Sequence, residues 1–187
     1  GPRLAQVLLA ILAPLALVLA AVRLVASPVF LWLEYHRPGF PADRFGFTLA
    51  DRMHYGSAGL DYVTNLAGPR YLSSLTHQGA PLFTEVEVDH MTDVKTVLWI
   101  AAAALVVLVV VCALLIASLL RTSPGGVRRA LFAGAVWLPL AVIALAVLAV
   151  LGWETFFAGF HSLFFADGTW TFSVRDALIR LYPQQFW

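Results

Sequence analysis

The chain has 187 residues, a formal net charge of +1, a hydrophobic fraction of 60% and a charged fraction of only 12%. Soluble domains carry about 25% charged residues, so a mean hydropathy of +0.82 excludes an ordinary water-soluble protein and predicts one that needs a bilayer as its solvent. The near-neutral charge provides no basic field for nucleic acid. The single cysteine, Cys112, lies in an apolar run and cannot form an internal disulfide.

The first apolar segment covers residues 1–33 and predicts a transmembrane helix, because about 20 apolar residues span a bilayer core. Pro14 removes one backbone donor and is expected to kink this helix. Arg23, near its far end, is expected to reach the interface or to pair inside the protein. Gly1 and Pro2 stand where an initiator Met would be, so we expect a processed N-terminus.

Residues 34–93 are more polar and too long for a simple connection, so they predict a folded cap that is mostly helical. Thr48 followed by Asp51 is typical of the start of a helix. Residues 82–88 alternate briefly and predict a short strand or an extended lead-in. Asp89 is then the candidate N-cap of the helix that follows.

Residues 94–120 and 130–153 are long apolar segments, and each predicts a transmembrane helix. The loop between them, residues 121–129, contains three arginines and no acid, so the positive-inside rule places it in the cytoplasm. The first span then runs outward, the second inward and the third outward. The cap and everything after residue 153 are therefore expected to be extracytoplasmic.

Residues 154–187 predict an outer segment rich in aromatic side chains that ends in a short amphipathic helix. An interfacial aromatic belt, which membrane proteins commonly use, would explain such a composition. The density of rings around His161 also favours a more specific role, because an ionisable group at membrane depth indicates a functional site. A histidine satisfied by one backbone carbonyl is the structural alternative.

Two of the five histidines stand at span ends that face outward. His90 lies three residues before Asp93, so the two share a helix face, and the carboxylate would favour an imidazolium or fix the ring tautomer. A cluster of acids at the positive end of a helix dipole is the alternative. His161 is the second candidate. The other three are expected to be ordinary surface residues: His36, His54 and His77.

These residues carry a resemblance to a family of small bacterial integral membrane proteins that includes the lipoprotein intramolecular transacylase. The matching pieces are HMTDVK at residues 90–95 and FHSLFFADGTWTFSVRDALIRLYPQQFW at residues 160–187. The family pattern there is FHxxFF, a Trp-x-Phe and a Leu-Ile-x-Leu-x-Pro-x-x-Phe run. The resemblance implies four membrane spans and an extracytoplasmic cap. This chain stops at Trp187, where a fourth span would begin, so we expect three spans and a truncated fourth.

The resemblance implies an acyl shift within one substrate molecule, a diacylated lipoprotein in the bacterial cytoplasmic membrane. The acyl group at sn-2 of the glyceryl moves to the α-amine of the N-terminal Cys and leaves a lyso-form lipoprotein. The two catalytic histidines of the family correspond to His90 and His161. The active site would face the extracytoplasmic side. Lipoprotein and membrane lipid are the expected partners, and the expected state is a monomer.

The chemistry agrees with that implication, because converting an ester to an amide is downhill and needs no cofactor. We expect His90, oriented by Asp93, to act as general base, and His161 as general acid or oxyanion donor, or the reverse. A water-poor chamber would limit hydrolysis. The side chains expected to line it and bind substrate are Phe157, Phe160, Phe164, Phe165, Trp170 and Phe172. Supporting polar contacts are expected from Arg175, Arg52 and Tyr182.

Two other functions remain open. A zinc-dependent membrane hydrolase could use the same histidines, although the chain lacks an HExxH motif and we expect no metal. A non-enzymatic lipid or lipoprotein chaperone could bind acyl chains with the aromatic residues, in which case both histidines would be structural.

Overall fold

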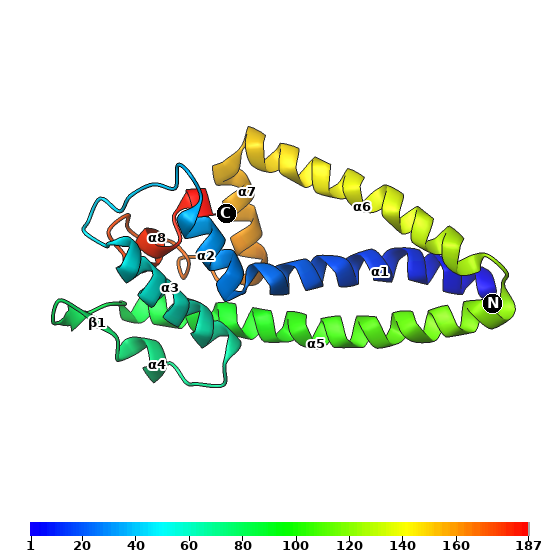
Figure 1. The fold of residues 1–187 in the computed structure, drawn as a ribbon, viewed down its shortest axis with the longest axis horizontal. Helices are drawn as coiled ribbons and strands as arrows, with labels where there is room; N and C mark the ends of the chain where they lie inside the picture. The colour runs from blue at the N-terminus through cyan, green and yellow to red at the C-terminus, as the bar shows by residue number, and fades with distance from the viewer. Residues whose placement is uncertain (187) are drawn as a thin grey trace. The chain divides into compact units, whose positions relative to one another are not determined.

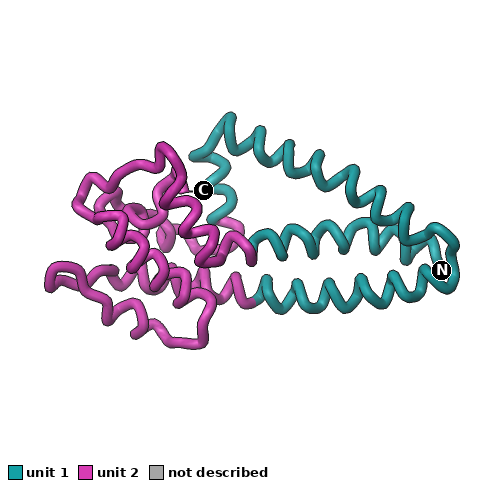
Figure 2. Tube along the Cα trace, in the orientation of Figure 1, with its two compact units in different colours: residues 1–22, 100–161 teal, residues 23–99, 162–187 magenta. Residues whose placement is uncertain are grey.

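The computed structural model describes residues 1–186 and is helical through most of its length (Figure 1). Trp187, which closes the predicted outer segment 154–187, lies outside the described residues. The chain divides into two compact units (Figure 2). Unit 1 contains Gly1–Val22 and Ile100–His161, and unit 2 contains Arg23–Trp99 and Ser162–Trp187.

Three helices are long and apolar enough to cross a membrane: α1 (Pro2–Val25), α5 (Glu85–Thr122) and α6 (Gly126–Leu151). Few of their side chains are buried inside the protein, as expected of helices whose apolar surface faces lipid and whose backbone groups are satisfied internally. The prediction of an all-α membrane protein with three spans is therefore confirmed.

The first apolar segment, predicted as one helix over residues 1–33, contains a break. Its second part is a separate helix, α2 (Pro28–His36), which begins after Ser27. The Ser27 hydroxyl accepts from a backbone N–H of the first turn at 3.3 Å, the usual way in which serine starts a helix. Arg23 donates to the carbonyl of Ala26 at 2.6 Å, so its guanidinium satisfies backbone at the end of α1.

The cap contains α3 (Leu49–Thr64), α4 (Arg70–Ser73) and a two-stranded antiparallel hairpin of β1 (Thr76–His77) and β2 (Ala80–Pro81). The predicted start of α3 is confirmed. Thr48 Oγ1 accepts from the N–H of Asp51 at 3.1 Å, and Asp51 Oδ2 accepts from the N–H of Thr48 at 2.8 Å. This reciprocal pair satisfies two backbone donors that a helix would otherwise leave open.

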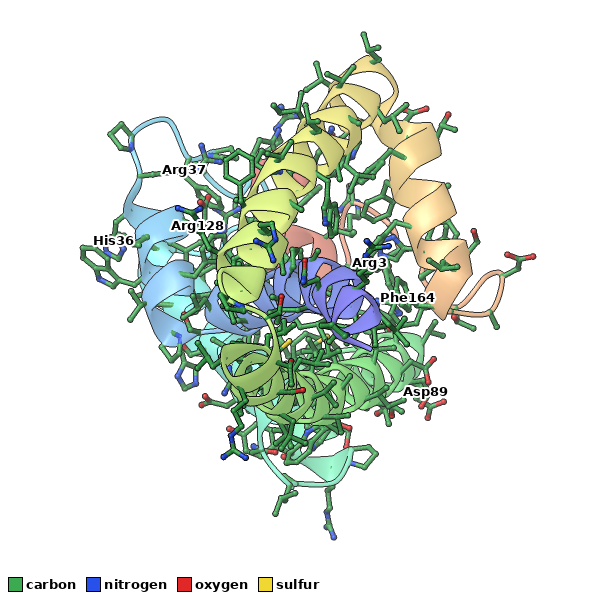
Figure 3. The ribbon with its side chains drawn as sticks, turned by 90° about the vertical axis from the view of Figure 1, so that its right-hand side faces the viewer. Arg3, His36, Arg37, Asp89, Arg128 and Phe164 are labelled. Carbon is green, nitrogen blue, oxygen red and sulfur yellow. The ribbon has the colours of Figure 1, made fainter. Side chains whose placement is uncertain are left out.

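The start of α5 differs from its prediction. The helix begins at Glu85, so residues 85–88 are helical, and Asp89 lies inside the helix instead of capping it. Thr84 and Glu87 form the cap, because Glu87 Oε2 accepts from the N–H of Thr84 at 2.8 Å. The exposed Asp89 side chain points away from the helices (Figure 3). The Thr-x-x-Glu pattern at residues 84–87 is the sequence signal for this start.

Unit 2 has a hydrophobic core between α3, the start of α5 and the C-terminal helix α8 (Ala177–Leu181). Two glycines of α3 allow tyrosine hydroxyls to approach its backbone closely. A Cβ added at Gly56 would lie 2.5 Å from the Tyr35 hydroxyl, and one added at Gly59 would lie 2.5 Å from the Tyr182 hydroxyl. A short 3₁₀ helix, η1 (Gln184–Phe186), follows α8, and Phe186 packs against Tyr35.

Unit 1 is held by contacts between α1, the end of α5 and α6. Gln6 donates to Ser123 Oγ at 3.0 Å, which fastens the start of α1 to the turn joining α5 and α6 (Figure 1). This turn is shorter than the predicted loop 121–129, because α5 continues to Thr122 and α6 begins at Gly126. Pro14 lies against α6, where a Cβ added at Gly134 would be 2.8 Å from its ring.

Candidate active site

His161 lies on α7 (Trp153–Phe164), the helix that follows α6 directly. Its Nδ1 is 2.8 Å from the backbone carbonyl oxygen of Phe157. A carbonyl oxygen only accepts, so Nδ1 carries the hydrogen. In the neutral ring Nε2 is then the proton acceptor. The Phe157 ring centroid lies 3.9 Å from that of the imidazole, which restricts the ring further.

The aromatic residues of α7 form a stripe beside His161. Trp153, Phe157, Phe160 and Phe164 recur at helical spacing, and His161 follows at the edge of this stripe. No residue of α7 is buried, and Phe160 is 51% exposed. Figure 3 shows the Phe164 side chain on the same helix. The helix therefore presents an apolar surface to its surroundings and carries the imidazole at the border of that surface.

His90 lies in unit 2, in the early turns of α5, and is only 8% exposed. Its ring contacts two aromatic side chains of the C-terminal segment. The centroid distances are 4.9 Å to Phe165 and 5.3 Å to Phe172, with interplanar angles of 64° and 61°. Phe165 and Phe172 were both expected to line a substrate chamber. The structure places these two rings on His90, so an imidazole is held in an apolar setting outside the long uncharged part of α5.

Glu87 organises this region and was not among the expected site residues. Its side chain is fully buried at 0% exposure, one helical turn before His90. One carboxylate oxygen accepts from the N–H of Leu178 at 2.8 Å, and the other accepts from the N–H and hydroxyl of Thr84. Glu87 thus joins the start of α5 to the start of α8, and the segment carrying Phe172 leads into α8.

The other residues of the HMTDVK stretch mostly serve the packing of unit 2. Thr92 Oγ1 lies 2.8 Å from the Tyr62 hydroxyl, and the Lys95 ammonium is 4.3 Å from the centre of the Tyr62 ring. Lys95 also donates to the carbonyl of Ala67 at 2.5 Å. Asp93 is exposed, and its expected part in orienting His90 stays a prediction.

The three expected supporting residues also contact unit 2 itself. The Tyr182 hydroxyl donates to the Gly56 carbonyl at 2.7 Å, and burial raises its pKa well above the ordinary value. Arg52 is buried, donates to the Pro41 carbonyl at 2.6 Å, and has its pKa lowered by burial. Arg175 is exposed, with its guanidinium 5.1 Å from the Phe45 ring. These contacts give Tyr182 and Arg52 a structural role in the cap.

His90 belongs to unit 2 and His161 to unit 1, so their convergence on one substrate stays a prediction. Phe157 and Phe160 accompany His161 in unit 1, whereas Phe164, Phe165, Trp170 and Phe172 belong to unit 2. Among the described residues of either unit, no three His, Cys, Asp or Glu side chains gather as a metal ion would require.

The sequence pattern of the family described as lipoprotein intramolecular transacylase Lit matches residues 7–187, nearly the whole chain. The chain belongs to this family. A protein of Aquifex aeolicus (strain VF5), described as an uncharacterized protein, is 30% identical over 188 residues, which cover 99% of this chain and 83% of that protein. No solved structure matches the chain.

Membership of the lipoprotein intramolecular transacylase family gives the chain a general activity, acyl transfer on lipoproteins. Both histidines lie inside the matched residues. The transacylase assignment also accounts for the three apolar helices, because a lipid-bearing substrate lies in the bilayer.

Proposed function

We propose that this transacylase moves the acyl group at sn-2 of the glyceryl to the α-amine of the N-terminal Cys of a diacylated lipoprotein, giving its lyso-form. The α-amine nitrogen attacks the ester carbonyl carbon, one N–H proton leaves, and an amide bond forms. The bond to the glyceryl oxygen breaks, and that oxygen takes up a proton. No atom is gained or lost overall, so the reaction needs no cofactor or second substrate.

The two histidines supply the proton transfers in this proposal. The α-amine has an ordinary pKa of about 7.7–8.0 and must lose its proton before it attacks. His161 is the better candidate for the base, because the bond from Nδ1 to the Phe157 carbonyl fixes the tautomer whose basic nitrogen is Nε2. His90 would then protonate the glyceryl oxygen or stabilise the oxyanion. The sequence left both orders open, and this is the second of them; in the first, Asp93 orients His90 as the base.

The aromatic rings support the proposal by providing an apolar setting for the ester. Phe165 and Phe172 contact His90, and Phe157 contacts His161. Rings at these positions would hold acyl chains and limit water, which would otherwise hydrolyse the ester. Because donor and acceptor belong to one molecule, positioning alone is worth effective molarities of about 10⁵–10⁸ M.

The single observation that carries the proposal is the burial of His90 against two phenylalanine rings, Phe165 and Phe172, near the start of a membrane-length helix. Burying a polar group costs free energy, so the burial of an imidazole at this position favours a functional role for His90. We further propose a monomer in the bacterial cytoplasmic membrane. The arginine-rich turn would lie in the cytoplasm and His90 and His161 on the extracytoplasmic side.

The test is incubation of the purified chain with a synthetic diacylated lipopeptide in micelles, followed by mass spectrometry with fragmentation. We expect an unchanged total mass and an acyl group that has moved to the amine. A product lighter by one acyl chain would instead indicate hydrolysis, and zinc analysis would then follow. Tight lipopeptide binding with no change in acyl position would support a lipid-binding protein and overturn the proposal.

A further inference from the structure

The end of α6 opposite to α7, the helix that carries His161, adjoins the turn that follows α5 (Figure 1). The residues around this turn form an open groove in unit 1. It is formed by the end of α5, the turn and the first turns of α6. Most of its lining is apolar, with Leu120, Val127, Leu131 and Phe132 among the contributors. Arg128 is the charged residue in the lining. The groove therefore offers an apolar surface for a hydrocarbon chain and one cationic side chain, Arg128.

Four arginines lie at the end of unit 1 that contains this groove, and one of them, Arg128, lines it. Arg121 lies in the last turn of α5, Arg128 and Arg129 lie in the first turn of α6, and Arg3 lies at the start of α1. Figure 3 views this end of unit 1, with Arg3 and Arg128 labelled. The one acidic residue in the sequence of unit 1 is Glu154, beyond the far end of α6. Among the described residues, no ion pair joins these arginines to a carboxylate.

Arg129 is held at the turn by neutral groups. It donates to Ser123 Oγ at 3.3 Å and to Gln6 Oε1 at 3.5 Å. Its Nη1 lies 3.3 Å from the position that a Cβ on Gly125 would occupy, and Gly125 lines the groove. The guanidinium is therefore positioned beside the groove while its charge remains unneutralised by protein.

We propose that this groove binds an anionic phospholipid, with its phosphate on Arg128 and Arg129 and an acyl chain along Leu131 and Phe132. Guanidinium and phosphate pair through charge-assisted hydrogen bonds, and basic pockets between transmembrane helices accept such headgroups. The apolar lining distinguishes a lipid from a soluble anion, which would leave the hydrocarbon surface unused. This site is separate from the lipoprotein site and does not depend on the proposed reaction.

The proposal is tested with the whole purified chain in a zwitterionic detergent. Phosphatidylglycerol, phosphatidylcholine with the same acyl chains, and inorganic phosphate are titrated separately, and bound lipid is counted by native mass spectrometry. We expect phosphatidylglycerol to be retained and to raise the unfolding temperature, and the other two to do neither. The Arg128→Gln/Arg129→Gln variant should bind phosphatidylglycerol about 30-fold more weakly, since each arginine near a headgroup contributes about 1 kcal/mol.

Two matched controls separate this site from general charge and from folding. Arg44→Gln/Arg70→Gln removes the same charge from exposed positions of unit 2 and should bind phosphatidylglycerol like the wild type. Ala135→Trp fills the groove and should weaken binding, whereas Ala133→Trp, which does not line it, should not. Equal retention of the two phospholipids by the wild type, or undiminished binding by a folded Arg128→Gln/Arg129→Gln variant, would overturn the proposal.

Discussion

Glu87 accepts a hydrogen bond at 2.8 Å from the backbone N–H of Leu178, across 91 positions of sequence. The carboxylate is fully buried, and its other oxygen caps its own helix at Thr84. One side chain thus satisfies the first turn of α5 and the first turn of α8. The same α5 turn leads to His90, and the segment before α8 supplies Phe172, so this bond unites the two parts of the His90 environment.

We expect Glu87→Gln to destabilise the protein by about 1–3 kcal/mol, because its amide would turn an N–H toward backbone donors that now meet an acceptor. Thermal unfolding in detergent measures this loss. Glu85→Gln, at an exposed position in the same turn, is the control and should unfold like the wild type. A Glu87→Gln protein as stable as wild type would show that this buried carboxylate does not organise unit 2.

We expect His161→Ala and His90→Ala each to lower lipopeptide conversion by at least about 10²-fold, the usual contribution of a general acid or base. His36→Ala is a close control for His161→Ala. The His36 Nδ1 makes the same hydrogen bond as that of His161, 2.8 Å from the carbonyl of Trp32 one turn earlier. Its ring is stacked on that indole, whereas the His161 ring is tilted against Phe157. If loss of this hydrogen bond to the helix backbone were the cause of lower conversion, His36→Ala and His161→Ala would lower conversion to the same extent. Near-normal conversion by either His161→Ala or His90→Ala would exclude the proposed pair.

Asp43 and Arg180 give unit 2 a stability that depends on pH. Burial would raise the pKa of Asp43, but hydrogen bonds and charge from Arg180, with the N–H groups of Phe47 and Phe45, outweigh burial and lower it. An acid with a lowered pKa in the folded state adds stability above its unfolded pKa, about 3.9 for Asp. That stability is lost as the pH falls through the folded pKa.

Unfolding temperatures measured from pH 7 down to pH 3 should therefore fall more steeply for the wild type than for Asp43→Asn. At pH 7 the variant should be less stable by about 1–3 kcal/mol, since Arg180 loses a charged acceptor. Asp89→Asn, at an exposed position, should keep the wild-type profile. Parallel profiles for wild type and Asp43→Asn would show that this ion pair does not contribute.

We expect Gly56→Ala to destabilise unit 2 by about 1–3 kcal/mol, because its Cβ would lie 2.5 Å from the Tyr35 hydroxyl. Tyr35→Phe removes that oxygen and also loses the bond from the hydroxyl to the Leu181 carbonyl at 2.8 Å. The double variant should lose less stability than the sum of the two single variants, because phenylalanine lacks the closest atom and leaves only ring carbons at 3.2 and 3.3 Å from the added Cβ. Additive losses of stability in thermal unfolding would show that Gly56→Ala destabilises the protein for a reason other than its clash with the Tyr35 hydroxyl.

Local patterns in the sequence were sufficient for several features of this protein. Long uncharged runs determine α5 and α6, because only apolar side chains tolerate lipid. Thr48 and Asp51 determine the start of α3, because the cap involves neighbouring residues. His90 and His161 were identified as candidates from their flanking residues and their places at span ends. Each of these inferences depends on interactions within a few residues of the chain.

Only the tertiary structure decided which distant residues meet. The contact of Phe172 with His90, the bond between Glu87 and Leu178, and the fit of Tyr35 over Gly56 join residues far apart in sequence. Hydrophobic periodicity indicates which face of a helix is buried, but it carries no information on the partner or register of that face. These contacts follow from how α2, α3, α5, α8 and the segment before α8 pack as a set, because close packing admits few arrangements of the same side chains.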